Sequence, residues 1–109
     1  MRVPLKRFWV VVKPFKLPAV LEALEGFRVG GLLVSECRGY GRQKGHLELY
    51  EGSEYQITFL PKARIEFLAS AFEADAIVEA VRSAAATGRI GDGKIFLSDV
   101  RRCEGWEGA

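Results

Sequence analysis

A glycine-rich segment near the C-terminal end of the chain contains the residue types that bind phosphate. It runs from Gly88 to Lys94 and has the sequence Gly-Arg-Ile-Gly-Asp-Gly-Lys. Its glycines permit a tight turn whose backbone amides can approach an anion, and Lys94 adds a positive charge. The segment lacks the P-loop signature, so it is not that class of phosphate cradle. Two interpretations stay open, a phosphate-binding turn that also uses Arg89 or an ordinary glycine-rich connection.

A second basic segment lies in the middle of the chain, from Arg38 to Gly45. Arg42 can grip a phosphate with two hydrogen bonds, and Gln43 can orient a carboxylate or a metal-bound oxygen. A solvated basic loop is the alternative interpretation. Contact with RNA is disfavoured, because Tyr40 is the only aromatic residue in this cluster and the acidic residues that follow would repel a phosphate backbone.

The polar residues after this segment offer sites for modification rather than for catalysis. Tyr50, Ser53 and Tyr55 lie among glycine and glutamate, a setting in which a hydroxyl is either modified covalently or simply exposed. His46 is the only histidine, and it has no partner at a spacing typical of a nucleophile and its base. We therefore expect no catalytic residues, although a phosphohydrolase is conceivable on the fold predicted below.

The composition is that of one globular domain covering residues 1–109, with 49% hydrophobic and 28% charged residues. The 16 basic and 14 acidic residues give a net charge of +2, which is weak for a protein that binds duplex DNA. Cys37, Cys103 and one histidine fall short of the four ligands of a structural zinc site, so we expect free thiols in a reducing cytosol. The apolar run Phe8–Val12 is too short to cross a bilayer, and we expect a cytoplasmic protein.

Apolar spacing along the chain predicts four strands and two helices. The second helix follows the capping-box pair Ser70 and Glu73. A long polar segment over residues 39–62 separates the second and third strands, and its few apolar residues are compatible with short hairpin arms. The expected order is a strand at 8–12, a helix from Pro18 to about Gly26, a strand from Leu32 toward Arg38, a strand at 63–69, a helix between Ser70 and Thr87, a strand at 94–97 and a loose tail over about 103–109.

This order of elements is typical of the ferredoxin-like double βαβ fold, an α+β fold with an antiparallel sheet and both helices on one face. The other face of the sheet also has apolar candidates, among them Trp9, Val11, Leu33 and Leu68. A monomer that exposes such a face is unusual. We therefore expect a homo-oligomer in which these sheet faces pack together.

Several strings of the sequence, taken in order, resemble the PII nitrogen-regulatory signal proteins. The resemblance runs without a gap from about Phe8 to Val100, and it rests on many short matches rather than on one glycine motif. The matching strings are Lys13–Leu17, Gly39–His46, Glu48–Tyr50, Phe59–Lys62, Ile65–Glu66 and Thr87–Phe96.

The resemblance implies a homotrimer that binds ATP or ADP in the clefts between subunits and the effector 2-oxoglutarate beside Mg²⁺-ATP. Gln43 and Lys62 match the effector positions, and Gln43 would meet the metal only through Mg²⁺-ATP. No residue is implied to be catalytic. The positions that match nucleotide-binding residues of the family are Gly39, Gly41, Arg42, Gln43, Gly91, Asp92, Gly93 and Lys94.

The polar segment over residues 39–62 resembles the family's T-loop, which docks on a regulated enzyme, transporter or transcription regulator. The resemblance implies a signal protein of nitrogen metabolism without enzymatic activity, direct nucleic-acid binding or membrane insertion. The bound ligand would select among conformations of this loop. Tyr55 and Ser53 match residues that are modified in relatives. The alternative is a PII-like sensor of another pathway, such as carbon uptake, that prefers ADP or AMP.

Three departures from the family pattern bear on these expectations. Glu51 stands beside the modification site, where relatives have a basic residue, and it reverses the local charge. Gly105 and Glu107 stand where the family has an Arg-x-Arg pair on the phosphates. The loss of each charged hydrogen bond is expected to weaken triphosphate binding by about 1.5–3 kcal/mol. Leu33 stands where relatives often have a threonine near the adenine.

Overall fold

The computed structural model describes residues 3–43 and 56–105, with the backbone alone for 41–43 and 56–58. Four strands and two helices form this part of the chain, and a single 3₁₀ turn precedes each helix. In chain order the elements are β1 (Leu5–Val12), η1 (Pro14–Lys16), α1 (Leu17–Leu24), β2 (Val29–Gln43), β3 (Gln56–Ser70), η3 (Ala71–Glu73), α2 (Ala74–Ala85) and β4 (Gly93–Asp99).

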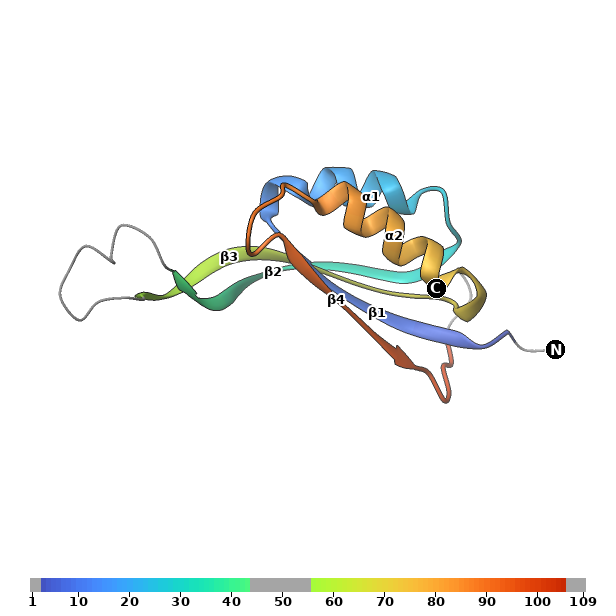
Figure 1. Cartoon of the computed structure of the whole chain (residues 1–109). Helices are drawn as coiled ribbons and strands as arrows, with labels where there is room; N and C mark the ends of the chain where they lie inside the picture. The colour runs from blue at the N-terminus through green and yellow to red at the C-terminus, as the bar shows by residue number, and fades with distance from the viewer. Residues whose placement is uncertain (1–2, 44–55, 106–109) are drawn as a thin grey trace.

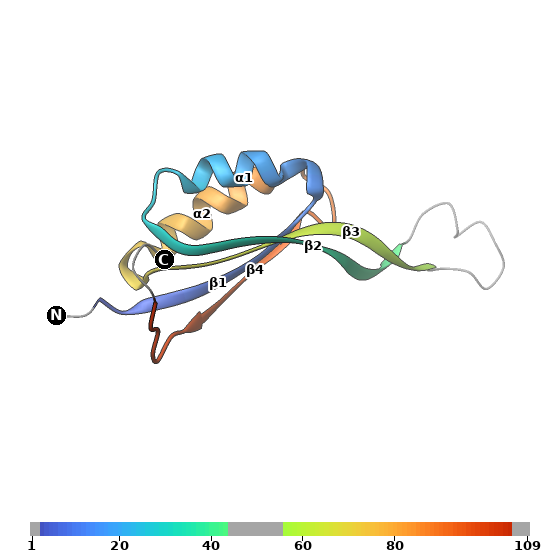
Figure 2. The same cartoon turned by 180° about the vertical axis from the view of Figure 1, so that it is seen from behind.

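The four strands form one antiparallel sheet in the order β2-β3-β1-β4. Both helices cover the same face of this sheet and leave the opposite face open (Figures 1 and 2). α1 connects β1 to β2 across β3, and α2 connects β3 to β4 across β1. This arrangement confirms the predicted ferredoxin-like double βαβ fold. It also brings the end of β1 next to the start of β4, where the glycine-rich segment lies.

Local sequence signals explain where the helices begin. Pro14 and Pro18 occupy first-turn positions of η1 and α1, where the amide hydrogen that proline lacks would have no helical partner. The hydroxyl oxygen of Ser70 accepts a hydrogen bond from the amide of Phe72 at 3.1 Å. This cap confirms the predicted helix start at Ser70, with the 3₁₀ turn η3 leading directly into α2.

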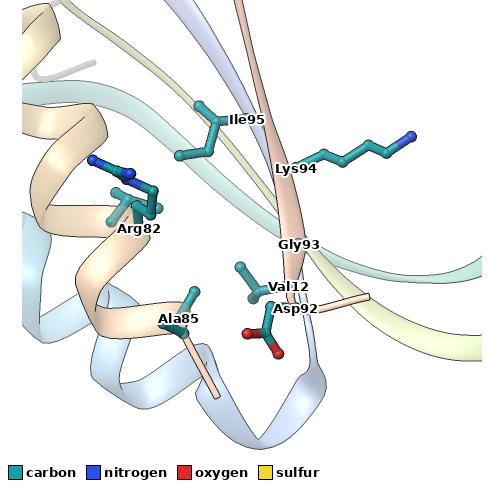
Figure 3. Close-up of a pocket in the computed structure, with 9 residues that line it drawn as sticks. Val12, Arg82, Ala85, Asp92, Gly93, Lys94 and Ile95 are labelled. Carbon is teal, nitrogen blue, oxygen red and sulfur yellow. The ribbon is translucent and has the colours of Figure 1, made fainter. Parts of the chain in front are cut away.

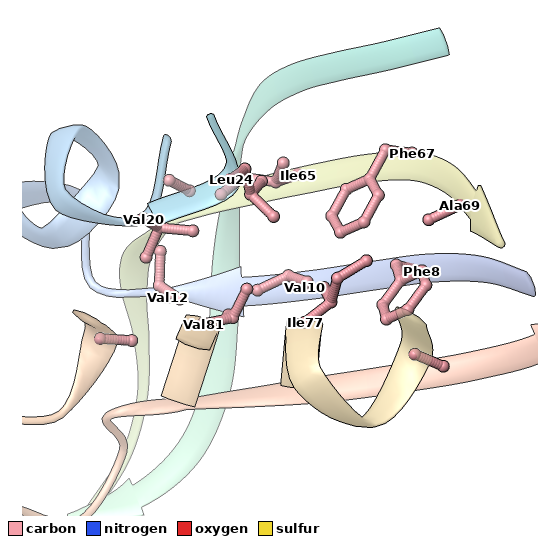
Figure 4. Close-up of a cluster of buried hydrophobic side chains, with 13 residues drawn as sticks. Phe8, Val10, Val12, Val20, Leu24, Ile65, Phe67, Ala69, Ile77 and Val81 are labelled. Atoms are coloured by element: carbon pink, nitrogen blue, oxygen red, sulfur yellow. The ribbon is translucent and has the colours of Figure 1, made fainter. Parts of the chain in front are cut away.

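The hydrophobic core lies between the helices and the sheet (Figure 4). Alternate residues of β1 and β3 point into it, because successive side chains of a strand point to opposite faces. Phe8 and Phe67 stack in this layer with ring centroids 4.7 Å apart. Burial of each large apolar side chain contributes about 1.5–3 kcal/mol. The buried set is Phe8, Val10, Val12, Val20, Leu24, Ala63, Ile65, Phe67, Ala69, Ala74, Ile77, Val81 and Ala85.

The open face of the sheet has exposed apolar side chains, as predicted. Trp9, Leu33 and Phe96 are 37%, 65% and 49% exposed, whereas Val11 and Leu68 are half-buried. The rings of Trp9 and Phe96 lie side by side with centroids 5.6 Å apart. Glu66 lies between Leu33 and Trp9 on this face, so charged and apolar side chains alternate there. Exposed aromatic and aliphatic side chains among charged ones are typical of an interface rather than of a solvated monomer.

β2 and β3 continue past the helices as a two-stranded arm, formed by Cys37–Gln43 and Gln56–Lys62 (Figure 1). The structure therefore corrects the predicted loop over residues 39–62 at both ends and favours the hairpin arms. The rings of Tyr40 and Phe59 face each other across the arm with centroids 5.2 Å apart. Such cross-strand aromatic pairs stabilise an antiparallel ladder, which explains why a glycine-rich, charged segment is still strand.

Candidate functional site

The glycine-rich segment is the connection between α2 and β4, and the pairing of β1 with β4 determines its position. Val12 pairs with Gly93, so Lys13, the next residue of the chain, lies beside Asp92. The backbones are so close here that a Cβ at Gly93 would lie 2.4 Å from the carbonyl oxygen of Val11. Only glycine fits at this position, and the start of β4 is thereby fixed against β1.

The carboxylate of Asp92 points back into its own loop. Its Oδ2 accepts hydrogen bonds from the amides of Thr87 at 2.6 Å, Gly88 at 2.9 Å and Arg89 at 3.3 Å. Its Oδ1 accepts a hydrogen bond from the hydroxyl of Thr87 and lies 3.1 Å from Nζ of Lys13. The hydrogen bonds from Thr87, followed by those from Lys13 and the Arg89 amide, hold the pKa of Asp92 well below its ordinary value. Asp92 is therefore ionised at neutral pH.

This geometry refines the role expected of Asp92. Its own carboxylate occupies the amides of residues 87–89, so those amides are engaged within the loop. The hydrogen bonds to this carboxylate come from residues 87–89 and not from Ile90–Lys94. Sequence reasoning missed Thr87 and Lys13 as partners of Asp92. The strand order could have identified Lys13 as a partner of Asp92, because an antiparallel pair places the residue after β1 beside the residue before β4.

Lys62 joins this loop to the arm. Its Nζ donates a hydrogen bond to the carbonyl oxygen of Gly91 at 2.8 Å. Its methylene stem crosses Gly39, where an added Cβ would lie 3.0 Å from Cγ of Lys62. A glycine in the interior of a strand is typical of such a close approach. Gly39, Lys62 and Gly91 therefore form one continuous contact between β2, β3 and the loop.

The side chain of Lys94 leaves the loop on the open face of the sheet. Lys94 and Arg64 both pair with Val11, so the three residues share this face. On the helix side, between α2 and the start of β4, there is a pocket of about 350 Å³ with Arg82 and Ile95 in its wall. Figure 3 shows Lys94 pointing away from this pocket. A phosphate that uses the Lys94 ammonium group must therefore bind on the open face, not in the pocket.

Comparison with known proteins places these features in a family. The model of the family described as nitrogen regulatory protein P-II matches residues 5–106. The chain is 52% identical over 96 residues to nitrogen regulatory protein P-II of Rhizobium meliloti, covering 88% of this chain and 86% of that one. The chain belongs to the P-II family. It is also 48% identical over 98 residues to nitrogen regulatory protein GlnK of Escherichia coli K12, covering 90% of this chain and 88% of that one.

Two solved GlnK structures from B. subtilis have the fold of this P-II chain. The GlnK–ATP complex matches with a TM-score of 0.72 at 28% identity, covering 90% of this chain and 85% of that one. GlnK in a second structure matches with a TM-score of 0.71 at 28% identity, covering 90% and 86%. P-II proteins are regulatory signal proteins. The expectation that the chain is not an enzyme is therefore confirmed, and the phosphohydrolase alternative has no support.

The expected site residues of this P-II protein fall into two groups. Gly39, Lys62 and Gly91–Lys94 gather where the arm joins the body of the domain. Gly41–Gln43 lie further out on the arm, with their backbones paired to Gln56–Thr58. The structure thus brings the first group together and places the second on the adjoining part of β2.

Several expected residues lie outside the described part of the chain. These are Tyr55 and Ser53, expected to be modified, and Glu107 in the tail.

In the described part, no group of three metal-ligating side chains could hold a metal ion, and no helix is long and apolar enough to cross a membrane. Cys37, half-buried, and Cys103, exposed, are free thiols as predicted.

Proposed function

We propose that this P-II protein is a cytoplasmic homotrimer that binds ATP or ADP between its subunits and regulates nitrogen metabolism. The phosphates lie against Gly91–Lys94 of the loop and, on the arm, against Gly39, Gly41, Arg42 and Gln43. The B. subtilis GlnK–ATP complex, which has the same fold, supports this choice of ligand. The family name, nitrogen regulatory protein, supports the pathway.

The observation that carries the proposal is the contact through Lys62. This lysine touches Gly39 with its stem and Gly91 with its amine, at 2.8 Å from the carbonyl oxygen. Two segments whose residue types suit phosphate binding, far apart in the chain, therefore meet at one cation. A lysine ammonium group has three donors and a flexible stem, so it can turn from a carbonyl to a ligand anion with little movement of the backbone.

The open face of the sheet supports a site between subunits. Lys94 lies on the same face as Trp9, Leu33 and Phe96, and these three apolar side chains are 37%, 65% and 49% exposed. Packing this face against other copies would bury the apolar surface and enclose the neighbourhood of Lys94. A nucleotide there would be covered by two chains, and a single chain would bind it weakly.

The effector proposed for the same site is 2-oxoglutarate, bound beside Mg²⁺-ATP. Lys62 would pair with a carboxylate of the effector, and Gln43 would approach the metal through Mg²⁺-ATP. An anion that recruits the Lys62 amine removes it from Gly91 and so changes the contact between arm and loop. The T-loop over residues 39–62, with Ser53 and Tyr55 as modification sites, would then dock on a regulated partner in one ligand state and not in the other.

Calorimetric titration with ATP, with and without Mg²⁺ and 2-oxoglutarate, tests the proposal. We expect ATP binding, and 2-oxoglutarate binding only when Mg²⁺-ATP is present. Arg42→Ala and Lys94→Ala each remove a charged hydrogen bond of about 1.5–3 kcal/mol, so ATP affinity should fall about tenfold or more. Arg28→Ala, which removes an exposed cation from the connection between α1 and β2, is the matched control. Unchanged affinity in both site variants would contradict the site.

A sensor that prefers ADP or AMP and serves another pathway is the second candidate. Gly105 favours it, because a glycine stands where the family has one of two arginines on the phosphates. Parallel titrations with ATP, ADP and AMP separate the candidates. Tighter binding of ADP or AMP than of ATP, without any response to 2-oxoglutarate, would support the second one.

A further inference from the structure

We propose that Lys13 positions the phosphate-binding loop, residues 87–93, by holding and neutralising the carboxylate of Asp92. The inference rests on the proposed nucleotide site and adds to it a positioning residue from another part of the chain. Lys13 follows β1, whereas the loop follows α2, and the two meet only because β1 pairs with β4.

The amine of Lys13 lies at the centre of the contacts that shape the loop. Its Nζ is 3.1 Å from Oδ1 of Asp92 and 3.4 Å from the hydroxyl oxygen of Thr87. The side chains of Lys13 and Asp92 are only 21% and 22% exposed, which makes theirs the most protected ion pair between described residues. Water and salt therefore screen this pair less than they screen a surface ion pair.

The backbone that carries this amine is fixed on both sides. Val12, directly before Lys13, is fully buried and pairs with Gly93. The carbonyl oxygen of Lys13 accepts a hydrogen bond from the amide of Lys16 at 2.9 Å, which closes the turn η1. Pro14 disfavours the helical conformation for the residue before it, and Lys13 is extended with φ −64° and ψ 140°. Lys13 can therefore act as a rigid support for the loop.

A loop that binds an anion needs this lysine because it contains a negative charge of its own. The Asp92 carboxylate is ionised at neutral pH, and it lies in the same short loop as the segment Ile90–Lys94. Left unpaired, its charge would repel a phosphate that approaches those amides. Lys13 cancels this charge from inside the domain and leaves Lys62 and Lys94 available to the ligand.

The first test needs no nucleotide. In ¹⁵N-labelled protein, the amide resonances of Thr87, Gly88 and Arg89 report the hydrogen bonds to Asp92. We expect Lys13→Gln to shift these resonances and to speed hydrogen exchange at the Gly88 amide, with Lys13→Arg restoring both toward the original values. Lys16→Gln removes the same charge three residues further on and should leave these amides unchanged. Unchanged amides in Lys13→Gln would overturn the proposal.

The second test measures ATP and adenosine binding to the same variants. We expect Lys13→Gln to weaken ATP binding about tenfold, which corresponds to about 1.4 kcal/mol, and to leave adenosine binding unchanged. Lys13→Arg should retain most of the affinity, and Lys16→Gln all of it. Because the two residues act as a unit, Lys13→Gln combined with Asp92→Asn should weaken ATP binding by less than the product of the single effects.

The outcomes separate this inference from the proposed function. Equal ATP affinity in Lys13→Gln, equal losses of ATP and adenosine binding, or fully multiplicative effects with Asp92→Asn would each overturn the role of Lys13. Failure of the unmodified protein to bind ATP would contradict the proposed function alone. In that case the amide resonances of residues 87–89 still decide whether Lys13 positions the loop.

Discussion

The loop between α2 and β4 and the arm formed by β2 and β3 meet at Lys62, yet they are held in opposite ways. Two contacts hold the loop: its own amides donate hydrogen bonds to the Asp92 carboxylate, and Gly93 packs against the Val11 carbonyl. The arm has its backbone ladder and the aromatic pair Tyr40 and Phe59, both about 60% exposed. The loop is thus shaped before a ligand arrives, whereas the arm depends on few side-chain contacts.

This difference assigns a separate task to each region. A preformed loop avoids the entropy of ordering when a phosphate binds, and that raises affinity. A two-stranded ribbon without a core is only marginally stable by itself, so small forces at its base can change it. Lys62 belongs to the ribbon but contacts the loop, and it is the described side chain through which one region can act on the other.

Among changes in the loop and the arm, the largest effect is expected from filling the close approach that fixes the loop to β1. In Gly93→Ala, the new Cβ would lie 2.4 Å from the carbonyl oxygen of Val11, so β4 must move. We expect the free energy of unfolding to fall by about 3 kcal/mol and ATP binding to be lost. Urea unfolding followed by circular dichroism measures the first effect, and calorimetry the second.

The matched control for this variant is Gly26→Ala, because a Cβ added there meets only the carbonyl oxygen of Ala23, at an ordinary 3.9 Å. Its effect should stay within about 0.5 kcal/mol. If both variants were equally stable, the loop would not be fixed by the contact between Gly93 and Val11. The loop would then be held no more firmly than the arm.

Strong acid should release the loop. The hydrogen bonds from Thr87 lower the pKa of Asp92 from its ordinary value of 3.8. A lowered pKa means that the ionised group stabilises the loop above pH 4 or so, and that this stabilisation is lost as the pH falls from there toward the lowered pKa. The Thr87 and Gly88 amide resonances, followed from pH 6 downward, should therefore move only in strong acid.

Two variants sharpen this acid prediction. Asp92→Asn should remove the titration of the Gly88 amide resonance altogether. Asp99→Asn, at the opposite end of β4, removes an exposed ion pair with Lys6 and should leave that titration unchanged. A Gly88 resonance that titrates near pH 4, like an ordinary carboxylate, would show that the Asp92 hydrogen bonds are weaker than the geometry indicates.

The body of the fold was predictable because its signals are local and periodic. The alternation of Ile65, Phe67 and Ala69 with Arg64, Glu66 and Leu68 assigns the two faces of β3 without any knowledge of the fold, and the structure confirms it. The helix start at Ser70 needs only a side chain and an amide two residues away. These features depend only on residues that are close in the sequence, so they can be predicted without the three-dimensional structure.

The arm and the interior of the loop depend on distant partners instead. Gly39 is typical of a turn until Lys62 is known to cross it. Asp92 belongs to a segment whose composition suits phosphate, and only the structure shows that its carboxylate bonds to the amides of residues 87–89. Lys13 becomes a partner of Asp92 only once the strand order is fixed.

The smallest effect on the free energy of unfolding is expected from a change in the arm. Tyr40→Ala removes one half of an exposed aromatic pair, and we expect a loss of about 0.5–1.5 kcal/mol in the free energy of unfolding. Phe67→Ala empties a buried position in the core and should cost about 3–5 kcal/mol. The amides of Thr87 and Gly88 should keep their resonances in Tyr40→Ala, because the loop is held from the body. If Tyr40→Ala moved these resonances, or cost as much as Phe67→Ala, the arm would be a stabilising part of the core, and it could not respond to a ligand independently of the loop.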